Sequence, residues 1–429
     1  MDSLSVFKET RSQETEETKE TYYLSIWTNV PESRMPKPRD NPLLNFGESV
    51  FSNRDALSES YEPDRILERD EEINQYAAAL RPIVEGSTPD NIMVYGNTGA
   101  GKTAVTRYMI DMMYEACENS GNALSTVFLN CNEMTAFKVV RTLVNELRDE
   151  DKDEFPARGL STRDALDALY EEIDNREGTC ILILDEIDHI ENIDSLLYDL
   201  SRSHSTGNLE HATVGIIGIS NDYTFRDILS SKTRGTFAEE ELDFTPYTAN
   251  ELEAILRDRA EIAFRDGAIT EAAINLCAAI AAQDSGNARQ GLDILHAAGK
   301  EADKKNDEQV TEVHIRTGKR NVERGNIERR INSLTVQQQH ILYTLALLEA
   351  DGQTPARTKE IYSLYTSVCE QSGLDPLSTT RSVREHLDKL SMQGFADQIL
   401  RNKGRGGGKY HVYECSMRAD IVLEIDLRE

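Results

Sequence analysis

The chain has 429 residues, which is enough for two or three domains with cores of their own. Its formal net charge of −29 is spread through periodic, core-forming sequence, which is typical of a folded acidic surface adapted to a salt-filled cytoplasm. The six cysteines are far apart and lack metal-ligand spacing, and no apolar run is long enough to span a bilayer. Disulfide-framework, zinc-finger and membrane-spanning classes are therefore excluded, and we expect a cytoplasmic, halophilic protein with no membrane partner.

The first part of the chain, residues 1–50, is acidic and rich in Thr, Ser and Pro. Such a composition buries too little apolar surface to fold alone, so we predict a disordered extension. One apolar island at residues 22–27 is compatible with docking on the body or with a lightly structured tail. Ordered sequence is expected from Phe51, with one helix ahead of residue 85.

A phosphate-binding loop is indicated by the stretch NIMVYGNTGAGKT at residues 91–103. Its apolar start predicts a buried strand, the pattern GxxxxGKT begins at Gly96, and a helical pattern continues to Met113. The glycines let amide N–H groups surround a β-phosphate at a helix N-terminus. Lys102 would reach the β- and γ-phosphates, and the Thr103 hydroxyl would hold a magnesium ion. We predict a nucleotide site here rather than a merely glycine-rich turn.

Helices and strands alternate after this loop with short connections, as a parallel sheet flanked by helices requires. Strands are predicted at residues 125–130, 180–184 and 213–220, and helices at 136–147 and 161–175. The carboxyl ends of such strands meet at one edge of the sheet, where ligands bind.

Polar residues follow two of these strands. In ILILDEID, Asp185 would position magnesium and Glu186 would polarise the water that attacks a phosphate. In GIIGISND, at the end of the next strand, Asn221 would hold that water or sense the γ-phosphate. The alternative for Asn221 is a turn residue that caps the following helix.

The remainder of the chain is predicted to be mostly helical before it ends in a hairpin. Three amphipathic helices are expected at residues 249–264, 271–283 and 288–303, and a charged connector spans residues 316–330. Three more helices, at 335–349, 359–372 and 378–393, precede strands at 396–401 and 409–415. Three helices followed by a hairpin is the order of a winged helix-turn-helix domain.

The charge distribution favours DNA as the partner of this last module. Residues 330–429 hold twelve Lys or Arg against thirteen Asp or Glu, and residues 381–411 hold seven against three. The predicted DNA contacts are Arg381 and Arg384 on the recognition helix and Arg401, Lys403, Arg405 and Lys409 on the wing. A protein-binding winged helix with a solvated basic loop is the alternative.

Several of these segments occur together in one known family. GNTGAGKT, LILDEID, GISND, PYTANELEAILRDRAEIAF and SGNARQGLDIL resemble the archaeal origin recognition and cell division cycle six type replication initiators, which are AAA+ ATPases. The resemblance runs from about Phe51 to the C-terminus. It implies an α/β AAA+ parallel-sheet P-loop core at residues 51–246, a helical lid at 247–325 and a winged helix-turn-helix DNA-binding domain at 326–429.

The resemblance also assigns residue roles. Asn221 matches the first sensor, Arg289 matches the second sensor on the lid, and residues 63–69 match the segment that shapes the adenine pocket. The implied ATP or ADP contacts are Thr98, Gly99, Ala100, Gly101, Lys102, Thr103, Tyr247, Arg259 and Arg289, with Glu186 and Asn221 as catalytic residues and Thr103 and Asp185 as Mg²⁺ ligands. One departure is Lys232, which stands where the family usually has an arginine that acts on a neighbouring subunit, with Arg234 two residues later.

The function implied is that of an ATP-dependent initiator that binds double-stranded origin DNA and helps recruit the replicative helicase. Paralogous initiators are expected as further partners, and the nucleoid as its place in the cytoplasm. ATP would act as a switch, hydrolysed slowly to ADP and phosphate. Two alternatives stay open: a divergent AAA+ paralogue that regulates replication or transcription, and a winged-helix signalling ATPase, either with little turnover.

Overall fold

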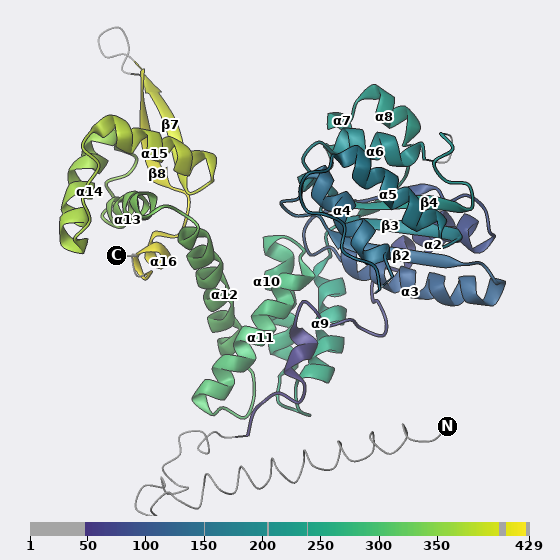
Figure 1. Cartoon of the computed structure of the whole chain (residues 1–429). Helices are drawn as coiled ribbons and strands as arrows, with labels where there is room; N and C mark the ends of the chain where they lie inside the picture. The colour runs from purple at the N-terminus through teal and green to yellow at the C-terminus, as the bar shows by residue number, and fades with distance from the viewer. Residues whose placement is uncertain (1–47, 150, 204–205, 238, 403–408, 426–429) are drawn as a thin grey trace, which may run out of the picture.

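The computed structural model describes residues 48–149, 151–203, 206–237, 239–402 and 409–425. These residues form an α/β core, a helical lid and a C-terminal winged helix, with the lid between the other two (Figure 1). The predicted disordered extension lies almost wholly outside the described residues, and so do Lys403 and Arg405. No helix in the described part of the chain is both long and apolar enough to cross a bilayer.

Five parallel strands form the sheet of the core in the order β2-β3-β4-β1-β5. They are β1 (Asn91–Gly96), β2 (Leu124–Asn130), β3 (Gly178–Asp185), β4 (Ala212–Ser220) and β5 (Glu239–Phe244). Side chains alternate between the two faces, so the isoleucines of ILIL in β3 pack on one layer and its leucines on the other. The predicted parallel-sheet fold is thereby confirmed.

Helices cover both faces of this sheet (Figure 1). α2 (Asp70–Val84) and α3 (Lys102–Ser120) bury their apolar stripes on one face. The other face is covered by α4 (Ala136–Leu147), α5 (Thr162–Asp174) and α6 (Ile193–Ser201). The short helices η5 (Ile187–His189), α7 (Phe225–Ile228) and α8 (Ser231–Thr236) lie in the connections of the core, whereas η4 (Arg54–Leu57) precedes the sheet and packs on the lid.

The edge strand β5 was not predicted from its sequence, EEELDF. Its three glutamates obscure the alternation, although Leu242 and Phe244 are buried while Glu241 and Asp243 are exposed. The strand pairs with β1 alone, and this edge position leaves room for the charged side chains.

The lid consists of α9 (Ala249–Ala263), α10 (Glu271–Asp284) and α11 (Ala288–Lys305), close to the predicted bounds. Residues 50–57 share its hydrophobic core even though they precede the sheet in the chain and, from Phe51 on, fall within the range predicted for the α/β core. The backbone N–H of Val50 donates to Asp303 at 2.8 Å, and the Phe51 ring stacks on Phe264 with centroids 5.0 Å apart. The first residues that the structure describes are therefore anchored to the lid.

α12 (Glu312–Asn332) is one continuous helix where a charged connector was predicted. Its many basic residues concealed an apolar stripe at Ile315, Gly318 and Val322, which follow helical spacing and pack on the lid core. The helix thus extends the lid and carries the chain into the winged helix (Figure 1).

Two alanine substitutions on α12 are expected to act in opposite directions. A Cβ at Gly318 would lie 2.8 Å from the Ile294 carbonyl oxygen and 2.9 Å from the Ala298 nitrogen, so Gly318→Ala should lower the free energy of unfolding. Overpacking of this kind costs about 1–3 kcal/mol. At Gly325 such a Cβ meets no described neighbour within 4 Å, so Gly325→Ala should stabilise. Helix propensity sets that gain at about 0.5–1 kcal/mol.

Urea unfolding followed by circular dichroism, at one KCl concentration, measures both variants. The Gly325 variant is the matched control because it changes the same residue type on the same helix. A Gly318→Ala protein as stable as the wild type would contradict the close packing of α11 against α12.

The C-terminal unit confirms the predicted winged helix. Its described elements are α13 (Val336–Ala350), β6 (Ala356–Arg357), α14 (Thr358–Ser372), α15 (Thr380–Met392), β7 (Ala396–Asn402), β8 (Lys409–Cys415) and α16 (Ala419–Leu423). The strands form an antiparallel sheet in the order β6-β8-β7. Neither the two-residue β6 nor α16 was predicted, because each is too short for a periodic pattern to emerge.

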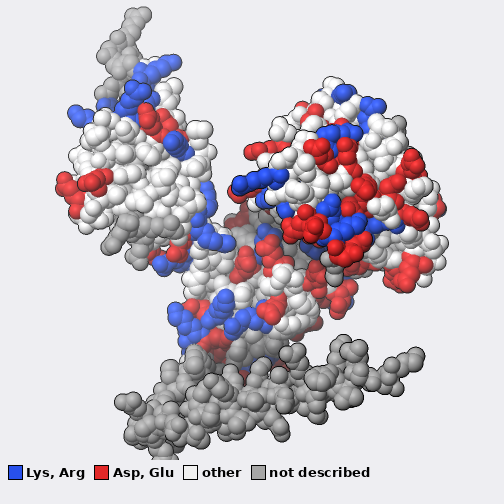
Figure 2. Space-filling model, viewed as in Figure 1, with Lys and Arg blue, Asp and Glu red and all other residues white. Residues whose placement is uncertain are grey.

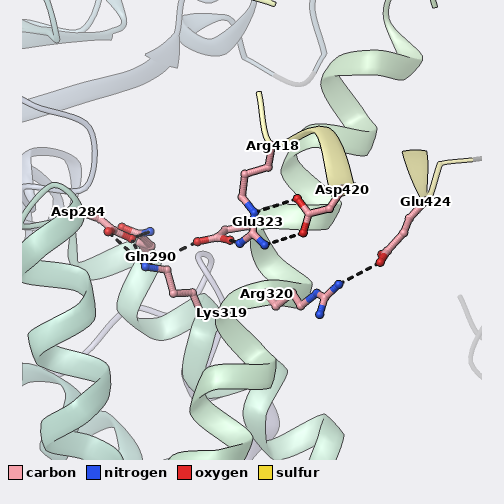
Figure 3. Close-up of polar contacts among 8 residues, drawn as sticks. All are labelled: Asp284, Gln290, Lys319, Arg320, Glu323, Arg418, Asp420 and Glu424. Carbon is pink, nitrogen blue, oxygen red and sulfur yellow. Dashed lines mark hydrogen bonds and ion pairs between the residues drawn. The ribbon is translucent and has the colours of Figure 1, made fainter. Parts of the chain in front are cut away.

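Ion pairs join α12 to the lid on one side and to α16 on the other (Figure 3). Lys319 contacts Asp284 at 3.1 Å and Glu323 at 3.6 Å, and Glu323 also accepts from Arg418 at 3.3 Å. Glu424 accepts from two arginines of α12. Because these side chains are partly exposed, each pair stabilises by at most about 1 kcal/mol. The ion pairs therefore contribute more to the orientation of α12 against the lid and α16 than to the stability of that packing.

Candidate functional site

The carboxyl ends of β1, β3 and β4 bring the predicted nucleotide residues to one edge of the sheet. β1 runs into the glycine loop, where Gly99 and Gly101 have φ values of +75° and +93°. A Cβ on Gly99 would lie 1.7 Å from Asn287 Oδ1, and a Cβ on Gly101 would lie 2.5 Å from the Tyr247 hydroxyl. Glycine is therefore required at both positions by conformation and by space. Thr98 is exposed at the tip of the same loop.

Lys102, the first residue of α3, has a buried side chain beneath this loop. Its ammonium donates to the carbonyls of Gly96 at 2.7 Å and Asn97 at 3.0 Å, and to Asn221 Oδ1 at 2.7 Å. Burial lowers the pKa of Lys102 to about 8, while the carboxylate of Asp185 opposes that shift. A buried cation whose hydrogen-bond acceptors are all neutral fits an anionic ligand such as a phosphate chain.

The predicted magnesium ligands also lie together. Thr103 Oγ1 donates to Asp185 Oδ2 at 3.0 Å, and the backbone N–H of Glu186 donates to Asp185 Oδ1 at 3.0 Å. Burial raises the pKa of the Asp185 carboxyl, which a bound cation would counteract. In the described residues no group of three or more His, Cys, Asp or Glu forms a metal site. A hydroxyl and one carboxylate fit Mg²⁺, since that ion takes its other ligands from water and substrate phosphates.

Glu186 stands just beyond β3 in a left-handed backbone conformation with φ of +57°. This conformation is uncommon for a residue with a side chain and is often found at functional sites. The Glu186 carboxylate lies 3.5 Å from His189 Nδ1 and is partly exposed, so it is accessible to water.

Asn221 does not cap the following helix, which was the alternative predicted for it. α7 begins after Thr224, and no side chain caps it. Instead the Asn221 amide oxygen accepts from Lys102 at 2.7 Å, beside the glycine loop. The sensor role of Asn221 remains a prediction, now with a position that suits it.

Arg259 on α9 is buried, and its guanidinium lies 4.2 Å from the centroid of the Tyr61 ring. Its Nε has no hydrogen-bond partner within the described chain, and burial lowers the pKa of Arg259. A buried, unsatisfied donor of this kind indicates a missing polar partner. A nucleotide beside the lid would supply it.

The first turn of α11 lies directly on the phosphate loop. The backbone N–H of Ala288 donates to the Gly99 carbonyl at 3.1 Å, and Asn287 caps the helix through Gln290 N. Arg289, the predicted second sensor, pairs with Glu59 and is about half exposed. The structure therefore places Arg289 at the edge of the site, engaged by a carboxylate that a phosphate would have to replace.

A second buried arginine was missed as an individual site residue. Arg69 Nη2 donates to the carbonyls of Ala100 at 2.8 Å and Thr245 at 2.7 Å, and the guanidinium lies 3.7 Å from the Tyr247 ring centroid. Glu72 accepts from Arg69 Nη1 at 2.6 Å. Arg69 thus joins the phosphate loop to the beginning of the lid. The resemblance placed residues 63–69 beside the adenine pocket, but no pattern in the sequence singled out Arg69 within that segment.

Lys232, which departs from the family pattern, lies on the exposed helix α8. Its ammonium is 4.0 Å from the centroid of the Tyr198 ring, and Arg202 donates to the Tyr198 hydroxyl. These two hydrogen-bonding cations lower the pKa of Tyr198. Arg234 is half-buried on the same helix.

The predicted DNA residues that the structure describes are all exposed on the winged helix. Arg381 and Arg384 lie on α15, Arg401 lies on β7 and Lys409 lies on β8. On the face shown in Figure 2, basic side chains gather at the end of the winged helix next to the wing, while acidic ones spread over the core. The roles of Arg381, Arg384, Arg401 and Lys409 as DNA contacts remain predictions.

Three family models match successive parts of this architecture. The AAA ATPase domain matches residues 65–211, the Cdc6 AAA+ ATPase-type lid domain matches 253–320, and the CDC6 C-terminal winged helix domain matches 329–425. The fold and the nucleotide-type site therefore define an AAA+ protein with a Cdc6-type lid and winged helix.

Comparison with individual proteins places the chain in one family within this class. ORC1-type DNA replication protein 8 of Halobacterium salinarum is 47% identical over 87% of this chain and 95% of its own length. ORC1-type DNA replication protein 11 of Haloarcula marismortui is 43% identical over 87% and 90%. The solved structure of the Aeropyrum pernix ORC1 protein in complex with DNA matches with a TM-score of 0.74 and 30% identity, covering 88% of this chain and 96% of that one. The chain belongs to the ORC1-type DNA replication proteins. The Halobacterium and Haloarcula relatives fit the halophilic character inferred from its charge and the archaeal origin implied by the resemblance.

Proposed function

We propose that this protein is an ATP-dependent replication initiator that binds double-stranded origin DNA and helps recruit the replicative helicase. ATP and ADP, with Mg²⁺ held by Thr103 and Asp185, would act as a switch with slow hydrolysis. Paralogous initiators would be further partners, and the protein would act at the nucleoid in the cytoplasm.

The switch is supported by one observation. Helix α11 of the lid contacts the phosphate loop, and the lid also packs along α12, the helix that leads to the winged helix. Ala288 contacts Gly99, and Gln290 in the same first turn donates to Asp284 at 3.0 Å. Asp284 in turn pairs with Lys319 of α12 (Figure 3). A change at the phosphates that moves α11 would therefore move the helix that leads to the DNA-binding domain.

DNA binding is supported from two directions. The Aeropyrum pernix relative was solved in complex with DNA, and the likeness covers the winged helix as well as the core. The exposed arginines of α15, with Arg401 and Lys409 at the ends of the wing strands, supply local positive charge in an otherwise acidic protein. Because phosphate contacts weaken steeply with salt, such a protein depends on base contacts as well as on charge.

Crosslinking the protein to DNA in its own cells, followed by genome-wide sequencing, tests this proposal. We expect a few sharp peaks at repeated sequences beside an initiator gene. The Arg381→Ala, Arg384→Ala double variant at the same expression level is the control and should lose the peaks. Diffuse occupancy, or peaks only at unrelated promoters, would contradict origin recognition.

A divergent paralogue with little turnover is favoured by one specific observation, the engagement of Lys232. An ammonium already over the Tyr198 ring is less available to a neighbouring subunit's nucleotide, and lysine cannot make the two-pronged contact of arginine. Phosphate release with and without DNA separates the two candidates, since the paralogue would bind nucleotide without measurable hydrolysis.

A further inference from the structure

The helix α15 carries an acidic residue, Asp388, on the side that also presents its arginines. Arg381, Arg384 and Asp388 are spaced three and four residues apart, so they lie along one stripe of the helix. A carboxylate there repels DNA phosphates and lowers non-specific affinity. We therefore expect Asp388 to make a contact that offsets this loss of affinity.

Two neutral side chains of the wing hold Asp388 in place. The Tyr413 hydroxyl donates to Asp388 Oδ1 at 2.7 Å, and Gln398 Nε2 donates to the same oxygen at 2.6 Å. Gln398 and Tyr413 are directly opposite each other on β7 and β8, and their side chains are 3.1 Å apart. Because Tyr413 is fully buried, this arrangement ties α15 to the two wing strands at a defined point.

The second carboxylate oxygen of Asp388 is turned toward Arg384. Asp388 Oδ2 lies 4.0 Å from Arg384 Nε, while the Arg384 side chain remains 53% exposed. A carboxylate on the Nε side leaves the two terminal nitrogens of the guanidinium free. These nitrogens form the fork that binds guanine O6 and N7 in a major groove.

We propose that Asp388 is a positioning residue that orients Arg384 to read a guanine in the major groove of duplex DNA. The inference rests on the proposed DNA-binding function and adds to it a base, a residue and the wing contact that sets the geometry. The carboxylate lowers the affinity for DNA phosphates at any sequence. It increases the difference in affinity between DNA with guanine at this position and DNA with another base there. A protein that works in high salt benefits from this exchange, because salt weakens phosphate contacts more than base contacts.

The experiment is selection of bound duplexes from a random-sequence library by the full-length protein, at one fixed KCl concentration, followed by sequencing. Wild type should enrich a motif that contains a guanine which Arg384→Ala loses. Asp388→Asn keeps the shape and an acceptor for Tyr413 but removes the charge, and it should lose the same guanine. On the selected duplex we expect its affinity to fall roughly 5- to 150-fold, the range of one bidentate arginine–guanine contact.

Glu385→Gln is the matched control. Glu385 lies on the same helix, is exposed and pairs with Arg381 at 3.2 Å, so its replacement removes an equal charge and an equivalent ion pair. That variant should keep the guanine. In the Arg384→Ala background Asp388→Asn should cause no further loss, whereas a purely structural role would still reduce binding.

The outcomes separate the inference from the function on which it rests. A wild-type protein that selects no motif would overturn site-specific DNA recognition itself. A motif that survives Asp388→Asn intact would overturn the positioning role alone. Equal loss of selected and random duplexes, additive with Arg384→Ala, would show that Asp388 only holds the wing in place and would also overturn it.

Discussion

Replacing Lys102 with alanine is expected to weaken ATP binding at least about 100-fold, because each hydrogen bond to a charged group contributes about 1.5–3 kcal/mol and Lys102 would make two phosphate contacts. The unliganded protein should lose little stability, since the buried ammonium is surrounded by neutral acceptors and its removal relieves the cost of burying a charge. Isothermal titration with ATP measures the affinity. The rise in melting temperature caused by ATP should disappear in parallel.

Lys138→Ala is the control for Lys102→Ala. Lys138 is exposed on α4, so its replacement removes the same charge from the same domain without reaching the glycine loop. Its ATP affinity should equal that of the wild type. Unchanged affinity in the Lys102 variant would refute the assignment of this loop as the phosphate site.

The sequence predicted most of the core because its signals are local. The buried strand, the glycine pattern and the ILILDEID run each combine a periodic apolar segment with a change of residue type at its end. The parallel sheet then brings those ends together, so the contacts of Lys102 with Asn221 and of Thr103 with Asp185 follow from topology. Elements without such contrast, β5 and α12 among them, were missed.

Contacts between distant segments were less predictable. Nothing near Arg69 in the sequence indicates that it will contact Ala100 and Thr245, which are far away in the chain. The pair of Arg289 with Glu59 likewise depends on how residues 50–69 cross from the lid to the core. Such contacts are set by domain packing, which leaves no period in the sequence to detect.

A second large effect is expected from Glu186→Gln, which should slow ATP hydrolysis by about 10²- to 10⁴-fold, the usual contribution of a general base. Glutamine has the same shape and still hydrogen-bonds water, but it cannot accept a proton from the water that attacks the γ-phosphate. ATP affinity should change little, because the Glu186 carboxylate lies beyond the strand end and the phosphate loop is left intact. Phosphate release in a single turnover measures the rate.

Glu191→Gln is the matched control, because Glu191 is an exposed carboxylate a few residues later in the same loop region. It should hydrolyse ATP as the wild type does, whereas equal rates for the Glu186 variant and the wild type would contradict the catalytic assignment. If ATP is a switch, the DNA affinity of wild-type protein loaded with ATP should change with time to that of the ADP-bound protein. In Glu186→Gln it should stay constant. The same variant therefore tests the catalytic role of Glu186 through phosphate release and the switch through the DNA affinity measured over time. A DNA affinity that still changes when ATP is not hydrolysed would show that hydrolysis and DNA binding are not coupled.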